Sequence, residues 1–124
     1  MACILVVDDE EPVRTTLRQM LEKAGHQIFE AANGEEAIRV FEDLKIDLVI
    51  TDIIMPEKEG IETIVGLRQT APDLKIIAIS GGGRTGNMDF LQLAKKFGAN
   101  GVLAKPFAVQ AVLDAVNSVL EQAE

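Results

Sequence analysis

Short apolar runs alternate along the chain with longer segments in which apolar residues recur every three or four positions. Most of these runs carry Ile, Leu and Val on both faces, which is typical of parallel strands that are covered by helices on both sides. The run at 27–31 alternates instead, which predicts a strand at the edge of a sheet. The five expected strands are 3–7, 27–31, 47–51, 75–79 and 100–104.

The segments between these runs predict helices. Pro12 suits the first helical turn, and Gly25 is a suitable stop for the helix that follows it. Asn33 stands three residues before Glu36, the spacing of a capping box at the start of a second helix. The remaining helices are expected from about 61 to 70, from about 87 to 98, and from about 108 onward.

Helical spacing also predicts which side chains meet the sheet. On the second helix we expect Ala37, Phe41 and Leu44 to be buried. On the fifth helix the expected buried face consists of Val109, Val112, Leu113, Val116 and Leu120.

Five strands in strict alternation with five helices predict an α/β fold, a (βα)5 doubly wound parallel sheet with right-handed crossovers. We expect one domain, residues 1–124, with no output domain. Parallel strands point their C-terminal ends to the same edge of the sheet, where ligands of such folds bind. The residues that end each strand are therefore the first candidates for a functional site.

Composition narrows the classes of partner. With 12 basic and 20 acidic residues the net charge is -8, which argues against direct nucleic-acid binding and binding to an anionic membrane. No apolar run approaches the ~20 residues needed to span a bilayer.

The single Cys3 excludes an internal disulfide framework and is expected to be a small core residue. The lone His26, after a helix stop, is expected at the surface. We expect a cytoplasmic protein.

Chemically complementary groups stand at four of the expected strand ends: Asp8 with Asp9, Asp52, Ser80 and Lys105. Each has an ordinary interpretation when taken alone. Asp52 fits a turn, Ser80 fits a glycine-rich loop, Lys105 fits a solvated surface, and acids favour a helix N-terminus. Their conjunction on separate strands is the more specific signal.

Phosphoryl transfer to a carboxylate fits this set of groups. Mg²⁺ (or Mn²⁺) prefers oxygen ligands, so Asp9 and Asp52 are expected to bind the ion directly, with Asp8 acting through water. The ion would neutralise clustered acids and leave Asp52 as the nucleophile. Lys105 would pair with one phosphoryl oxygen, and Ser80 would donate a hydrogen bond to another.

Several motifs then identify a family. They are VVDDE at 6–10, DIIMPEKEG at 52–60, Ser80 after an apolar strand, and Lys105-Pro106-Phe107, with AANGEEAI at 31–38 and FGANG at 97–101 as connecting segments. Over essentially its whole length the sequence resembles the receiver domain of two-component response regulators. The resemblance implies a flavodoxin-like fold with strand order 2-1-3-4-5.

The resemblance also implies a role for each site residue. The matching positions are Asp52 as phosphoacceptor, Asp8 and Asp9 as the acidic metal-binding pair, the backbone carbonyl of Ile54 as a further metal ligand, Ser80 as the hydroxyl and Lys105 as the phosphate-sensing lysine. The Lys105–Pro106 bond is expected to be cis. Val102 is a departure, since the family usually has Tyr or Phe there. We therefore expect the signal to pass through the 80–87 loop and the fourth helix.

By the same resemblance, the donor is a histidine kinase or a histidine phosphotransfer protein, and the downstream target is an unknown protein. A signalling switch is expected rather than a metabolic enzyme, with a dimer through the fourth helix, fifth strand and fifth helix as one assembly. The main alternative is an adaptor that works without phosphorylation, to which Val102 points. A haloacid-dehalogenase-like phosphatase is disfavoured, because it needs a second Asp two residues after the nucleophile and position 54 is Ile. A flavodoxin-like cofactor binder is disfavoured, because the acids of the first loop would repel the flavin phosphate.

Overall fold

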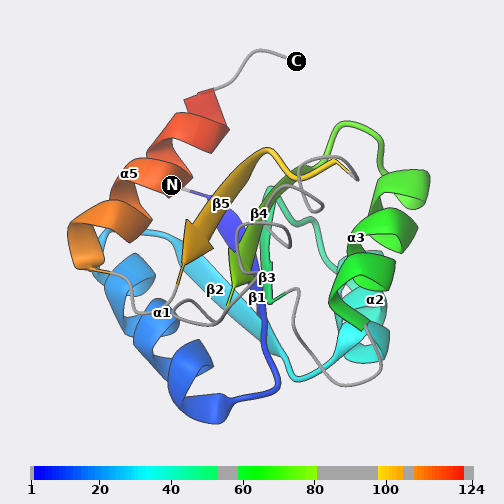
Figure 1. Ribbon diagram of the computed structural model, residues 1–124, viewed down its shortest axis with the longest axis horizontal. Helices are drawn as coiled ribbons and strands as arrows, with labels where there is room; N and C mark the ends of the chain where they lie inside the picture. Colours follow the sequence, from blue (N-terminus) through cyan, green and yellow to red (C-terminus); the bar gives the residue numbers. More distant parts are fainter. Residues whose placement is uncertain (1, 53–58, 81–97, 105–107, 122–124) are drawn as a thin grey trace.

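The five strands form one parallel sheet in the order β2-β1-β3-β4-β5, as Figure 1 shows. The computed structural model describes residues 2–52, 59–80, 98–104 and 108–121. Strand order, parallel pairing and flavodoxin-like architecture confirm the predicted fold, with β2 at an edge of the sheet. The strands are β1 (Cys3–Val7), β2 (Gln27–Ala31), β3 (Leu48–Asp52), β4 (Lys75–Ser80) and β5 (Gly101–Ala104).

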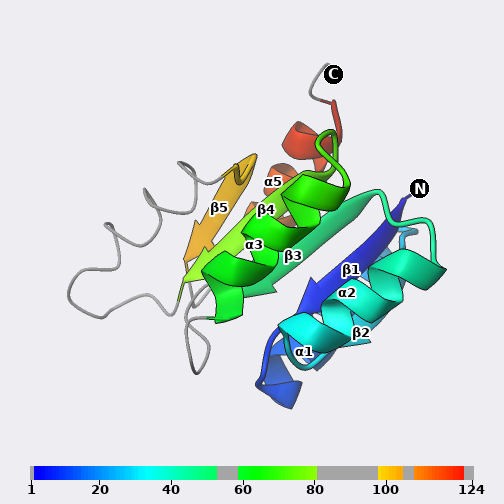
Figure 2. The ribbon, with the colours of Figure 1, turned by 90° about the vertical axis from the view of Figure 1, so that its right-hand side faces the viewer.

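Helices cover both faces of the sheet. The described helices are α1 (Glu11–Lys23), α2 (Gly34–Asp43), α3 (Glu59–Thr70) and α5 (Val109–Glu121). Figure 2 shows α2 and α3 side by side in front of the sheet, with α1 and α5 behind it. The fourth helix, expected from about 87 to 98, lies outside the described residues except for Gly98, whereas the other two elements of the expected dimer surface, β5 and α5, are described.

Alternation along β1 divides the core into two layers. Ile4 and Val6 are fully buried on the side of α1 and α5, where Leu17 and Val116 join the same cluster. Leu5 and Val7 are fully buried on the opposite side, in the cluster that contains residues of α2 and α3. A strand with both faces buried requires apolar residues at every position, which explains the continuous apolar run.

The predicted helix ends are largely confirmed. Pro12 lies in the first turn of α1, and Gly25 follows its end with φ of +96°, in the left-handed region that favours glycine. Asn33 is the N-cap of α2: its Oδ1 accepts a hydrogen bond from the Glu36 N–H at 2.9 Å. The Glu36 carboxylate accepts in return from the Ala32 N–H at 2.8 Å, one residue before the usual position of a capping box.

Two burial predictions are wrong. Leu44 is 40% exposed and Val109 is 50% exposed, although their spacing predicted core positions. Cys3 is half-buried, and its Sγ lies 3.6 Å from Oε1 of Gln27. His26 is half-buried, and its Nδ1 accepts a hydrogen bond from the Ala2 N–H at 3.1 Å.

Candidate metal centre and phosphorylation site

The strand register brings the C-terminal ends of the central strands to one edge. Val7 of β1 pairs with Thr51 of β3, so the residues that follow, Asp8 and Asp52, emerge side by side. On the other side of β3, Asp52 pairs with Ile79, the residue before Ser80. The predicted convergence of strand ends is therefore present for the first, third and fourth strands.

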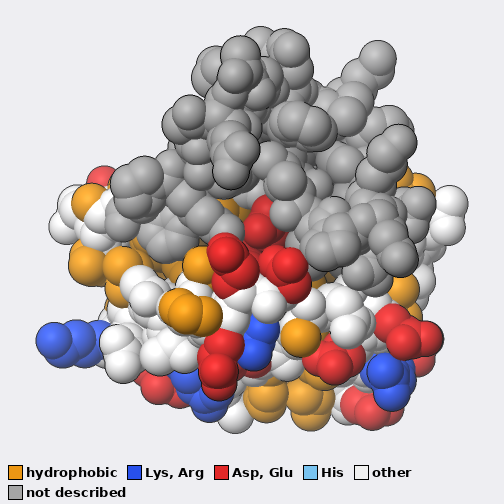
Figure 3. Space-filling model, turned by 60° about the horizontal axis from the view of Figure 1, so that its bottom comes forward, with side chains coloured by type: hydrophobic (Ala, Val, Ile, Leu, Met, Phe, Trp, Pro, Cys, Tyr) orange, Lys and Arg blue, Asp and Glu red, His pale blue; other side chains and the backbone are white. Residues whose placement is uncertain are grey.

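Asp8, Asp9 and Asp52 form an acidic cluster at this edge. One carboxylate oxygen from each lies within 4.8 Å of the others. Figure 3 shows acidic side chains gathered near the middle of the face that contains this edge. Asp8 is fully buried and Asp52 is 3% exposed, whereas Asp9 is exposed. Two of the carboxylates are thus removed from bulk water while the third faces it.

Backbone hydrogen bonds fix the position of Asp8. Its N–H donates to the Ala31 carbonyl at 3.1 Å, which extends the pairing of β1 with β2 by one residue. Its Oδ1 accepts a hydrogen bond from the Glu10 N–H at 2.8 Å. The Asp8 carboxylate is therefore oriented by the turn that leads into α1.

The donor set fits a small hard cation. Mg²⁺ binds oxygen at about 2.1 Å, so ligands on opposite sides of the ion are about 4.2 Å apart. Carboxylate oxygens within 4.8 Å of one another need only small adjustments to share one ion. Without a cation, three negative charges would repel one another at short range in surroundings that screen charge poorly. Asp8, Asp9 and Asp52 are therefore the residues that would hold the metal.

The other predicted site residues are only partly described. Ser80 is the last residue of β4 and pairs with Ala104 of β5. Ile54 and Lys105 lie outside the described residues, as do the expected cis bond to Pro106 and the loop at 81–87. Val102, the departure from the family pattern, is half-buried and packs against the core cluster on the side of α2 and α3.

Sequence reasoning missed an arginine–glutamate network beside the cluster. Arg14 of α1 donates from Nη1 to the Asp8 carbonyl at 2.7 Å and from Nε to Oε1 of Glu30 at 3.0 Å. Arg18, one turn further along α1, donates to Oε2 of Glu30 at 2.6 Å. The only signal in the sequence was the spacing of Arg14 and Arg18, which places both on one side of a helix.

Burial and hydrogen bonding act in opposite directions on Glu30. Desolvation would raise the pKa of Glu30, but hydrogen bonds from Arg18 and Arg14 outweigh it and hold the pKa below its ordinary value. The same bond to Glu30, with a second to Glu22, raises the pKa of Arg18. Glu30 is therefore ionised at neutral pH and accepts from two guanidinium groups.

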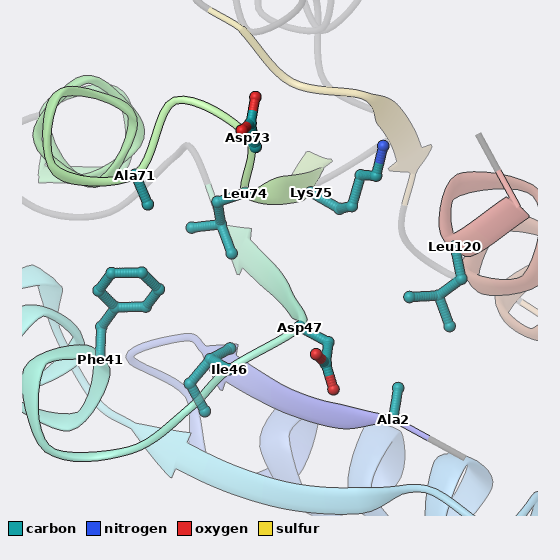
Figure 4. Close-up of a pocket in the computed structure, with 9 residues that line it drawn as sticks. All are labelled: Ala2, Phe41, Ile46, Asp47, Ala71, Asp73, Leu74, Lys75 and Leu120. Carbon is teal, nitrogen blue, oxygen red and sulfur yellow. The ribbon is translucent and has the colours of Figure 1, made fainter. Parts of the chain in front are cut away.

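A separate hollow of about 590 Å³ opens at the opposite edge of the sheet. Figure 4 shows its lining residues: Ala2, Phe41, Ile46, Asp47, Ala71, Asp73, Leu74, Lys75 and Leu120. Ala2, Asp47 and Lys75 mark the N-terminal ends of β1, β3 and β4, and the hollow contains none of the predicted site residues. Among the described helices, none is long and apolar enough to cross a membrane.

Comparison with known proteins agrees with the fold. A sequence model described as the response regulator receiver domain matches residues 4–117. The chemotaxis protein CheY of Thermotoga maritima is 38% identical over 117 residues, which cover 94% of this chain and 95% of that protein. The sensor kinase CckA of Brucella abortus is 36% identical over 98% of this chain, but the chain spans only 13% of that protein's length.

The solved receiver domain of NtrX from Brucella abortus superimposes with a TM-score of 0.90 at 28% identity, covering 97% of this chain and 99% of that one. Receiver domains bind Mg²⁺ at an acidic pocket, and the cluster of Asp8, Asp9 and Asp52 stands where such a pocket is expected. On the combined weight of family match, relatives and fold, the chain belongs to the response regulator receiver domains of two-component signalling.

Proposed function

We propose that this receiver domain accepts a phosphoryl group on Asp52 from the phosphohistidine of a kinase or phosphotransfer protein, with Mg²⁺ or Mn²⁺ as cofactor. The observation that carries the proposal is the cluster of three carboxylates within 4.8 Å, one of which belongs to Asp52. The domain would then act as a cytoplasmic switch that changes its contacts with a downstream protein.

In the proposed reaction a carboxylate oxygen of Asp52 attacks phosphorus as the bond from phosphorus to the donor imidazole nitrogen breaks. The phosphoryl group moves to Asp52, and the imidazole nitrogen keeps the electron pair of the broken bond. A bound divalent ion would supply charge compensation for the phosphoryl oxygens. Ser80 and Lys105 are assigned to the remaining phosphoryl oxygens, because Ser80 ends β4 and Lys105 comes directly after β5, the two strands beyond β3 on that side of the sheet.

Burial of Asp52 supports a nucleophile rather than a surface acid. At 3% exposure Asp52 is sheltered, and its backbone is held by pairing with Ile79 of β4 and by the pairing of the preceding Thr51 with β1. Such positioning contributes much of the rate in phosphoryl transfer, where little covalent chemistry is left to the protein. We propose a phosphoacceptor that assists its own phosphorylation and slow dephosphorylation, not a metabolic enzyme.

The test is intact-protein mass spectrometry after incubation with acetyl phosphate, in Mg²⁺ or in EDTA. We expect one added phosphoryl group that requires the metal and is lost in Asp52→Asn. Asp43→Asn, at the exposed end of α2, is the matched control and should be modified like the wild type.

An adduct of equal size on Asp52→Asn would contradict the assignment of the phosphoacceptor. Absence of any adduct, together with no response to fluoroberyllate, would favour the adaptor that works without phosphorylation. Val102 would then be the first residue to study, because a branched aliphatic side chain lacks the aromatic ring on which the usual switch depends.

A further inference from the structure

Arg14 connects the acidic cluster to the edge strand of the sheet. Its guanidinium binds two acceptors at once, the Asp8 carbonyl at 2.7 Å and Oε1 of Glu30 at 3.0 Å. The planar fork of arginine suits such paired contacts, because its donors are held in fixed directions. The connection crosses from α1 to both β1 and β2.

Two consecutive residues of β2, Glu30 and Ala31, hold the two backbone polar groups of Asp8, its carbonyl and its N–H. Ala31 accepts the Asp8 N–H directly at 3.1 Å. Glu30 acts on the Asp8 carbonyl through Arg14. With both backbone groups of Asp8 engaged, rotation about its backbone bonds is restricted, and so are the directions in which the Asp8 and Asp9 side chains leave the chain.

The network is sheltered, unlike an ordinary surface ion pair. The side chains of Arg14 and Glu30 are 15% and 25% exposed, whereas those of Arg39 and Glu35 on α2 are 67% and 84% exposed and 3.7 Å apart. Exposed pairs contribute little, because solvent screens them and the side chains remain mobile. Arg18 restrains Glu30 further from its second oxygen at 2.6 Å.

We propose that Arg14, oriented by Glu30, is a positioning residue that sets the geometry of the acidic cluster and thereby its affinity for a divalent cation. This inference rests on the proposed function, in which Asp8, Asp9 and Asp52 hold Mg²⁺. Mg²⁺ demands near-octahedral geometry, so small errors in ligand direction reduce affinity. Groups that orient metal ligands from outside the ligand set commonly change affinity about 10–100-fold.

The first experiment measures Mg²⁺ affinity by isothermal titration calorimetry in the whole chain. We expect Arg14→Met to weaken binding about tenfold, the low end of that range, because Arg14 acts through the backbone rather than on a carboxylate. Arg14→Lys should weaken binding to a similar extent, since a compact ammonium keeps the charge but cannot reproduce the paired contacts.

Glu30→Gln should weaken binding less than Arg14→Met does. When it is combined with Arg14→Met it should add no further loss, because both changes break one connection. Arg39→Met removes an exposed arginine and should bind Mg²⁺ like the wild type. Val119→Ala loses core packing at the other end of the sheet, next to Gly101, and controls for general loss of stability.

A second readout needs no metal. The Glu10 N–H donates to Oδ1 of Asp8, so its hydrogen exchange, followed by NMR, reports how well the Asp8 carboxylate is held. Exchange at Glu10 should accelerate in Arg14→Met and remain unchanged in Arg39→Met. A faster exchange spread evenly over the whole sheet would indicate lost stability and would contradict a positioning role.

The outcomes separate the two proposals. If Arg14→Met binds Mg²⁺ as tightly as the wild type while Asp9→Asn does not, the role of Arg14 is wrong and the metal site stands. Recovery of wild-type affinity by Arg14→Lys would show an effect of charge alone and would also overturn positioning. If the wild type itself binds no Mg²⁺, the proposed function fails first, and the inference fails with it.

Discussion

Arg68, close to the C-terminal end of α3, donates a hydrogen bond from Nη2 to Oδ1 of Asn100, 3.0 Å away and 32 residues later in the chain. The same guanidinium donates to the carbonyls of Pro72, at 2.8 Å, and of Leu74 and Gly98. Asn100 Oδ1 also accepts from the Ile76 N–H at 2.9 Å. One side chain thus ties the turn before β4 to the segment before β5. Burial lowers the pKa of Arg68, with Asp73 acting in the opposite direction.

Removal of this connection should destabilise the fold without changing the acidic cluster at the other edge of the sheet. We expect Arg68→Met to lower the free energy of unfolding by about 2 kcal/mol, because several carbonyls lose a charged donor. Urea denaturation followed by circular dichroism measures the change. Arg39→Met is the control, since its side chain is exposed. Equal stability of the two variants would show that water replaces Arg68 at no cost.

The N-cap of α2 gives a second prediction. Asn33→Ala should cost about 1 kcal/mol, since the Glu36 N–H loses its acceptor at 2.9 Å. Asn33→Ser keeps an acceptor in the same place and should retain most of the stability. Thermal unfolding of the three proteins tests this. A loss of similar size in both variants would contradict a capping role.

His26 predicts a pH dependence of stability. Burial lowers the pKa of His26 in the folded protein, and its neutral ring accepts the Ala2 N–H. Because the unfolded chain keeps a pKa near 6.5, it takes up the proton first as pH falls. The stabilisation is therefore present above about pH 6.5 and is lost as pH falls through the lower folded-state pKa.

The measurement for His26 is the midpoint of urea unfolding between neutral and mildly acidic pH. The wild type should lose stability over this range more steeply than His26→Gln, whose side chain does not titrate. Parallel curves for the two proteins would exclude His26 as the source.

The acidic cluster predicts that Mg²⁺ reverses the order of stability of the wild type and Asp52→Asn. In EDTA, Asp52→Asn should be more stable than the wild type by about 1 kcal/mol, because it removes one of three charges that lie within 4.8 Å. In Mg²⁺ the order should reverse, since the wild type gains binding free energy that the variant largely lacks. Differential scanning calorimetry in both buffers decides this. An unchanged order in Mg²⁺ would show that Asp52 is not needed for metal binding.

The hydrophobic pattern predicted the strands well, because a strand buried on both faces must be apolar at each position. Residues 3–7 and 27–31 match β1 and β2 without change. The strand order came from the resemblance to receivers and is confirmed. The clustering of Asp8, Asp9 and Asp52 followed from strand ends that share one edge, and the structure brings these three together.

The wrong burial predictions concern side chains at helix ends, and the contacts that the sequence did not predict join different elements. Leu44 is the C-cap of α2 with extended backbone angles, so helical spacing no longer directs its side chain. Val109 is the first residue of α5 and lines an open hollow beside Met20 and Lys23 of α1, so half of its surface stays exposed. The hydrogen bonds of Arg14 with Glu30 and of His26 with Ala2 depend on how α1 and the first two strands pack together. A local sequence pattern does not predict such packing.

The placement of β2 at the edge has a consequence for folding. β1 and β3 are neighbours in the sheet, but α1, β2 and α2 lie between them in the chain. The three acids therefore meet only when this long connection has folded and residue 52 lies beside residue 8. A fragment of the chain must reach from residue 8 to residue 52 to contain all three carboxylates of the cluster, and β5 contributes none of them. During refolding, the rate at which a divalent cation binds would therefore report the rate at which β1 and β3 pair. This pairing joins the residues that are farthest apart in the first half of the chain.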